Sequence, residues 1–295
     1  MNLNLENIEI MSFDQLMQSA QTAHLEGQHD EALCFRLAAY DSAVESPFNK
    51  GRAGRDVAAS LDRIGLTEPA VQWADEAYGV HDELVQSTTT DLVSAQEARK
   101  KKAKTEQEKS SVSDTTTDTI VKDPRDERSK NEDSTIALKN KVQEAIRERA
   151  ASGMYVGSLA LRQAINMEQA KEPHEEHSNK ALKYLRGAIT DINEYERYHR
   201  GTIDQYRINM TGRVALAEGL YGEKSMGIKL GLSQLALAPV SENAGIAPFI
   251  LHMPFPDRWK ARAKAAARGA GAIGATLLSY RPARGLALRV ADRVL

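Results

Sequence analysis

Two similar stretches of sequence decide the fold, AHLEGQHDEALCFRLAAY at residues 23–40 and LDRIGLTEPAVQWADEAY at residues 61–78. A shift of 38 residues aligns four pairs of small or aromatic residues: Gly27 with Gly65, Ala32 with Ala70, Ala39 with Ala77, and Tyr40 with Tyr78. Glycine suits the C-terminal end of a helix because it adopts left-handed backbone at little cost. Alanine suits a position where two helices cross closely. The repeat therefore predicts stacked pairs of helices.

Helical periodicity covers both repeats and the residues beside them. Apolar side chains recur at helical spacing in four segments, at residues 12–26, 30–44, 51–64 and 68–85. Ser12 and Asp30 suit the N-caps of helices, and Pro69 suits a first turn, where its missing N–H is tolerated. The short connections require neighbouring helices to pack antiparallel. We therefore expect an all-α fold.

The repeat resembles the tetratricopeptide repeat (TPR) family, whose helix-turn-helix unit has glycine at the turn and two alanines in the second helix. The resemblance is clearest over residues 12–85 and is degenerate over 178–239. The period of 38 residues exceeds the 34 of the family, and we expect residues 45–51 to hold the extra length in a connection. The resemblance implies a concave groove, lined by the first helix of each repeat, that binds a peptide.

Composition divides the rest of the chain into three further parts. Residues 87–134 have few large apolar side chains and many charged ones, so we expect a largely disordered linker after the head of residues 1–86. Within it, residues 91–109 contain good helix formers and can extend the preceding helix, whereas residues 110–133 are expected to be disordered. Residues 135–240 form a second helical block with degenerate TPR-like hairpins. Residues 241–295 form a proline-rich hinge and a basic helical tail.

The head and the tail differ in charge. The whole chain of 295 residues has a net charge of −2, whereas residues 1–91 have −11 and residues 241–295 have +6. The two ends therefore attract each other or attract different partners. For the tail, with a helix expected from Asp257, three interpretations remain open: a cap on the helical block, an arm for a partner or nucleic acid, and a segment at a membrane surface.

Three arginines in the first helix of the second repeat form the candidate binding site. Arg52, Arg55 and Arg63 lie within an arc of about 80° on a helix, opposite its apolar residues. The TPR resemblance places them in the groove, together with Gln21 and His24 of the first repeat. Forked guanidiniums bind carboxylates, so these five residues, the predicted groove set, indicate a partner with an acidic segment or a free carboxylate. The alternative is a solvated face whose arginines pair with neighbouring aspartates.

The sequence contains no pattern that predicts catalysis. It has no glycine-rich phosphate loop after a strand, no nucleophile elbow and only one cysteine. His174 and His177 have no third metal ligand at a suitable spacing. We therefore expect no enzyme and no cofactor. With no signal peptide and no apolar run long enough to span a membrane, we expect a cytoplasmic protein.

These observations favour a non-catalytic adaptor or scaffold that binds a peptide or protein segment in a concave helical groove. The alternative is a nucleic-acid-associated protein that uses the basic tail. A stable solenoid needs about three repeats, so we expect the head of two repeats to dock on the second block or to associate with another copy of itself.

Overall fold

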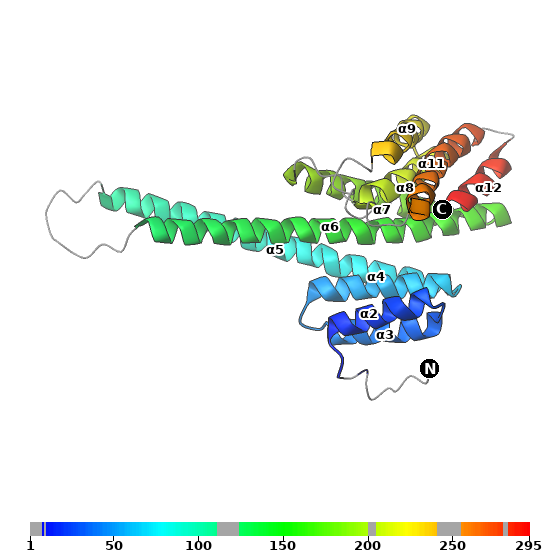
Figure 1. Cartoon of the computed structure of the whole chain (residues 1–295). Coiled ribbons are helices and arrows are strands. Elements are labelled where there is room, and N and C mark those ends of the chain that lie inside the picture. Colours follow the sequence, from blue (N-terminus) through cyan, green and yellow to red (C-terminus); the bar gives the residue numbers. More distant parts are fainter. Residues whose placement is uncertain (1–7, 9, 111–123, 200–204, 241–254, 280–282) are drawn as a thin grey trace.

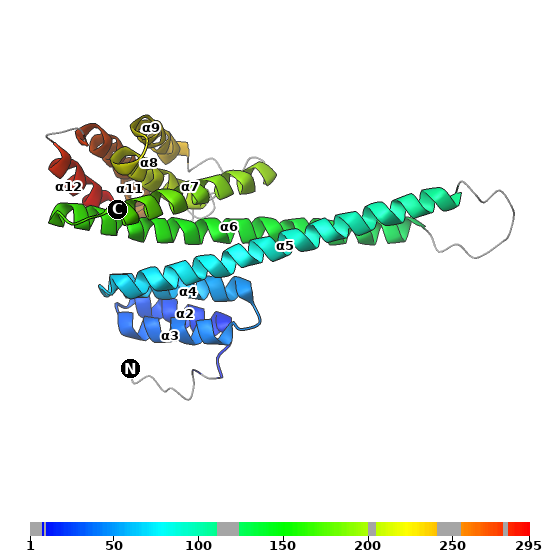
Figure 2. The same ribbon diagram turned by 180° about the vertical axis from the view of Figure 1, so that it is seen from behind.

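The computed structural model describes residues 8, 10–110, 124–199, 205–240, 255–279 and 283–295. In this part of the chain the fold is all-α (Figures 1 and 2), as expected. The helices are α2 (Phe13–Leu25), α3 (His29–Ser42), α4 (Pro47–Arg63), α5 (Thr67–Ser110), α6 (Pro124–Ala170), α7 (Glu175–Tyr198), α8 (Gln205–Tyr221), α9 (Lys224–Val240), α11 (Phe255–Leu278) and α12 (Arg284–Val294). None of the helices in the described residues is long and apolar enough to cross a membrane.

The ends of the first helices follow from local sequence. Ser12 caps α2 with a reciprocal pair of hydrogen bonds to Gln15. Gly27 and Gly65 have φ of +80° and +86°, which confirms the predicted helix stops at both turns. The predicted N-cap at Asp30 is wrong, because Gln28 precedes α3 and Asp30 lies in its first turn.

The aligned alanines lie where the helices cross. Ala32 and Ala70 are 1% and 0% exposed, and Ala39 and Ala77 are equally buried. The predicted packing of helix pairs through these positions is therefore confirmed. The connection before α4 ends earlier than the expected residues 45–51, because Ser46 is the N-cap of α4 and the helix begins at Pro47.

The linker expected to be disordered is helical where the structure describes it. Helices α5 and α6 have 44 and 47 residues, or roughly 65–70 Å each at 1.5 Å per residue. Residues 87–110 end α5, which confirms the predicted helical extension over 91–109. Residues 124–134 begin α6, so the expectation of disorder is wrong there. Residues 111–123 lie outside the described part of the chain. The two helices pack antiparallel and extend beyond the other helices as an arm (Figures 1 and 2).

The reason for this helicity is the second helix of the arm. A single charged helix buries too little apolar surface to be stable, but α5 and α6 supply partners for each other. Val85 of α5 packs with Val142, Ala145 and Ile146 of α6 at the base of the arm. A sequence pattern cannot show that two polar segments meet along their length.

The head docks on the helical block through α6. Val57, Ala58 and Leu61 of α4 form one apolar cluster with Val156 and Leu159 of α6. The apolar face of α4, opposite the expected groove face, therefore packs on a helix of the same chain. This contact answers the question of what covers the head of two repeats.

The described part of the tail belongs to the block. Helix α11 packs on α8 and α9, and α12 packs on α11 and α6. Ala272 and Ala275 of α11 share the core of the block with Ala287 and Leu288 of α12. The boundary expected between residues 240 and 241 therefore does not separate two hydrophobic cores. The described part of the tail packs on the helical block, in agreement with the first of the three interpretations, a cap on the block. Helix α11 begins at Phe255, two residues before the expected N-cap at Asp257. Residues 241–254 lie outside the described part of the chain.

Candidate anion-binding cavity between head and block

Buried ion pairs join the head to the block. Arg55 of α4 donates to Glu148 of α6 over 2.9 Å, and the Glu148 side chain is almost completely buried. Although burial favours the neutral acid, the Arg55 guanidinium holds the pKa of Glu148 below its usual range. Arg55 is thus occupied inside the protein.

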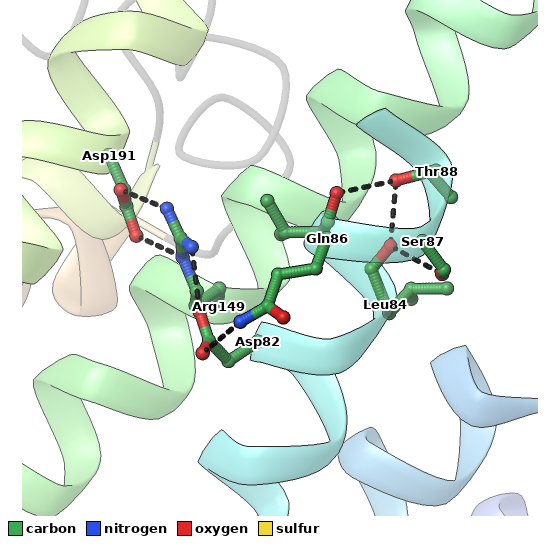
Figure 3. A network of polar contacts seen from close by, with 8 residues as sticks. Asp82, Leu84, Gln86, Ser87, Thr88, Arg149 and Asp191 are labelled. Atoms are coloured by element: carbon green, nitrogen blue, oxygen red, sulfur yellow. Dashed lines mark hydrogen bonds and ion pairs between the residues drawn. The ribbon is translucent and has the colours of Figure 1, made fainter. Parts of the chain in front are cut away.

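A second junction is formed by Arg149 of α6, which lies between two aspartates (Figure 3). Its guanidinium donates twice to Asp191 of α7, over 2.9 Å from Nε and 2.8 Å from Nη2. The remaining Nη1 donates to Asp82 of α5 over 2.8 Å. One side chain therefore holds three helices together, and these charges are satisfied.

The structure divides the predicted groove set. Arg55 faces α6, as described above. Arg52 is exposed, with its guanidinium 5.8 Å from the centre of the Phe48 ring, and Gln21 is exposed on α2. Arg63 and His24 alone are in contact: Arg63 Nη1 lies 2.6 Å from His24 Nε2. Burial and the charge of Arg63 lower the pKa of His24, so its neutral ring can accept this hydrogen bond.

A polar cavity of about 370 Å³ lies between α4, α6 and α8. We call it the junction cavity. It is partly open to solvent and is lined by Ala59, Asp62 and Arg63 of α4, by Tyr155, Ser158, Leu159 and Arg162 of α6, and by Arg213 of α8. Three arginines thus meet at one site from three helices.

Arg162 and Arg213 differ in their partners. Arg162 Nη1 donates to both carboxylate oxygens of Asp62, over 2.9 and 2.8 Å. Arg213 has no acidic side chain and no hydrogen-bond acceptor among the described residues, and its Nε is screened from solvent. Burial and the charge of Arg268 lower the pKa of Arg213 to about 10. Its cation is therefore held at a cost that an anion would offset.

Of the two hydroxyl groups in the cavity, that of Tyr155 adds a donor, whereas that of Ser158 donates within its own helix. Burial and the carboxylate of Asp62 raise the pKa of the Tyr155 phenol, so the phenol stays protonated. Ser158 donates to the carbonyl oxygen of Met154 over 2.6 Å, which positions its oxygen. The chemistry that this lining supports is the binding of an anion.

Sequence reasoning missed Arg162 and Arg213. Both stand inside apolar helical stretches, SLALRQAINM at residues 158–167 and GRVALAEGL at residues 212–220. An arginine inside such a stretch is a usable signal, because a charge on an apolar face needs a partner or a ligand. What the sequence does not show is that these two arginines, 51 positions apart, share a cavity.

The other candidate features are less complete. Among the described residues, no group of histidine, cysteine and carboxylate side chains is arranged to hold a metal ion; His174 lies near Glu168, which is itself bound by Arg284. Arg284 and Arg268 of the tail both contact the protein, Arg268 by donating to Asn209 over 2.6 Å. Arg289 and Arg293 of α12 are exposed, and the side chains of residues 258–264 lie outside the description.

Comparison of the chain with protein-family models, with curated proteins and with solved structures gives no match.

Proposed function

We propose that this protein is a non-catalytic helical adaptor that binds a segment of a partner protein by an anionic group, which enters the junction cavity. The single observation that carries the proposal is Arg213, a partly buried guanidinium whose Nε is screened from solvent and which has no anionic partner among the described residues, on the wall of a polar cavity. Hydrogen bonds from a guanidinium to an anion are among the strong ones in proteins.

The lining supports binding rather than catalysis. Guanidiniums remain protonated at neutral pH and do not act as general bases. The Ser158 hydroxyl donates to a main-chain carbonyl, so it is not paired with a base that would activate it. The carboxylate of Asp62 is engaged by Arg162.

The proposal retains the expected kind of partner and moves its site. An acidic segment or a free carboxylate was expected to bind five residues in an open groove, whereas the cavity uses only Arg63 of that set directly. His24 supports Arg63 from outside the lining through the contact of 2.6 Å. Arg162 and Arg213 take the places of Arg52 and Arg55.

The test uses the full-length chain and fluorescently labelled pools of short peptides, degenerate in sequence around one fixed anionic residue. The fixed residue is aspartate, glutamate or phosphoserine in separate pools. We expect at least one pool to bind, and Arg213→Met to weaken its binding at least tenfold in fluorescence anisotropy. Arg52→Met is the matched control, because Arg52 is an exposed arginine outside the cavity.

Two results would contradict the proposal. One is the absence of binding by every anionic pool. The other is equal binding by the wild-type chain and the Arg213→Met variant, since this would place the binding surface elsewhere.

A further inference from the structure

We infer that the anionic group in the junction cavity is the dianionic phosphate of a phosphorylated side chain on the partner segment; this inference rests on the proposed function and specifies its ligand. The charge of the cavity lining, its free donors and the cavity volume all favour a phosphate.

The charge of the lining matches a dianion. Arg63, Arg162 and Arg213 bring three positive charges, against the single negative charge of Asp62. The carboxylate of a partner would neutralise only half of the excess. A phosphate monoester carries a charge of about −1.5 to −2 at neutral pH, so it neutralises the excess almost completely.

The charges behind the lining act in the same direction. Burial, and then the charge of Arg268, lower the pKa of Arg213. Burial lowers the pKa of Arg36, and the charge of Arg63 lowers it further. Asp56 is a nearby carboxylate that favours the charged form of Arg36. Behind the lining, the two cations Arg268 and Arg36 therefore outnumber the one anion Asp56, so the net charge around the cavity remains positive.

The donors that remain free exceed what a carboxylate accepts. Among the described contacts, Arg162 uses only Nη1 for Asp62, Arg63 uses only Nη1 for His24, and Arg213 uses none of its N–H groups. A carboxylate offers two oxygens, whereas a phosphate monoester offers three terminal oxygens, each a strong acceptor. Three guanidiniums from three helices surround a tetrahedral anion better than a planar one.

The size of the cavity favours a side chain over a free ion. Its volume of about 370 Å³ equals that of about a dozen water molecules, so it holds a phosphate together with the side chain that carries it.

The experiment compares three degenerate peptide pools on the full-length chain by fluorescence anisotropy, with phosphoserine, glutamate or serine at the fixed position. We expect the phosphoserine pool to bind at least tenfold more tightly than the glutamate pool, and the serine pool not to bind. Inorganic phosphate should compete with the phosphoserine pool, and acetate at the same ionic strength should not.

Variants identify the site and separate binding from folding. Arg213→Met and Arg63→Met should each remove the preference for phosphoserine over glutamate, while Arg52→Met retains it. Arg63 is exposed, so its substitution tests the site even where the Arg213 variant folds poorly. Circular dichroism provides the check of folding for each variant.

Each outcome has a distinct meaning. Equal binding of the glutamate and phosphoserine pools overturns the phosphate inference and leaves the proposed function intact. Absence of binding by all anionic pools overturns both. Binding of inorganic phosphate as tight as that of the phosphoserine pool overturns the assignment to a partner segment. Preference for phosphoserine in both cavity variants overturns the site.

Discussion

His81 is a titratable residue that is completely buried where α4, α5 and α6 meet. Its Nδ1 lies 2.9 Å from the Ser152 hydroxyl, and its ring fills the space that a Cβ atom on Gly51 would need. Burial and the charge of Arg55 lower the pKa of His81 to about 4. The imidazole is therefore neutral in the folded protein under ordinary conditions.

This burial makes stability depend on pH. In the unfolded chain His81 binds a proton below about pH 6.5, whereas in the folded protein it resists protonation until about pH 4. The unfolded state therefore binds more protons in this window, and the free energy of unfolding should fall by up to ~3 kcal/mol as the pH drops from 6.5 to 4. Urea denaturation at several pH values measures this. A His81→Phe variant with an undiminished slope would contradict the assignment.

Glu148 is the buried partner on which Arg55 depends. Glu148→Gln should lower the free energy of unfolding by about 3–5 kcal/mol, because the Arg55 charge then stays buried without its counter-charge. Glu144→Gln, one helical turn earlier and only partly buried, is the control and should have little effect. The double variant Arg55→Met with Glu148→Met should recover much of the loss. A small effect of Glu148→Gln alone would show that Arg55 finds another partner or water.

At the scale of the helix, close crossings depend on glycine at particular positions. A Cβ atom on Gly157 of α6 would lie 2.6 Å from Cγ of Leu185 on α7, whereas one on Gly187 of α7 would meet no atom within 4 Å. The same substitution should therefore have opposite effects at these two positions.

Gly157→Ala should lower the free energy of unfolding by about 1–3 kcal/mol, because Leu185 and the helix that carries it must shift. Gly187→Ala should raise it by about 0.5–1 kcal/mol, because alanine loses less entropy in a helix. Chemical denaturation of both variants measures the pair. Equal effects in the same direction would contradict the crossing of α6 and α7 at Gly157.

Helices and their stops could be predicted where the information is local. Gly27, Gly65 and the aligned alanines are read within a single helix pair, and their roles follow from the residues themselves. The pairing of α5 with α6 in the arm could not be predicted, because residues 124–134 are polar and acquire a helical partner only when the two helices meet. The early start of α4 at Pro47 was missed for a different reason: ESPFNKG was assigned to the extra length of the repeat instead of to a cap at Ser46 followed by proline.

At the scale of the whole molecule, the head is covered by its own chain. Arg55 and Glu148 are 93 residues apart in sequence, and Asp62 and Arg162 are 100 apart. No periodicity within the head indicates these partners. This is why the predicted groove set contained Arg55, which pairs with Glu148, and lacked Arg162 and Arg213, which line the junction cavity.

The same arrangement explains why the cavity lies where it does. Its walls come from the head and from the block, so an anion held there contacts α4, α6 and α8 together. Its binding should therefore stabilise the folded chain as a whole, by a free energy that grows with the logarithm of the ligand concentration once this exceeds the dissociation constant.

The most direct test of the account is the thermal midpoint of the Arg213→Met variant, measured by circular dichroism with and without inorganic phosphate. Without phosphate, we expect a midpoint above that of the wild-type chain, because a partly buried cation without an anionic partner among the described residues has been removed. With phosphate, we expect the midpoint to rise for the wild type and not for the variant. A variant that melts below the wild type without phosphate, or that gains as much from phosphate, would contradict the claim that Arg213 is held ready for an anion.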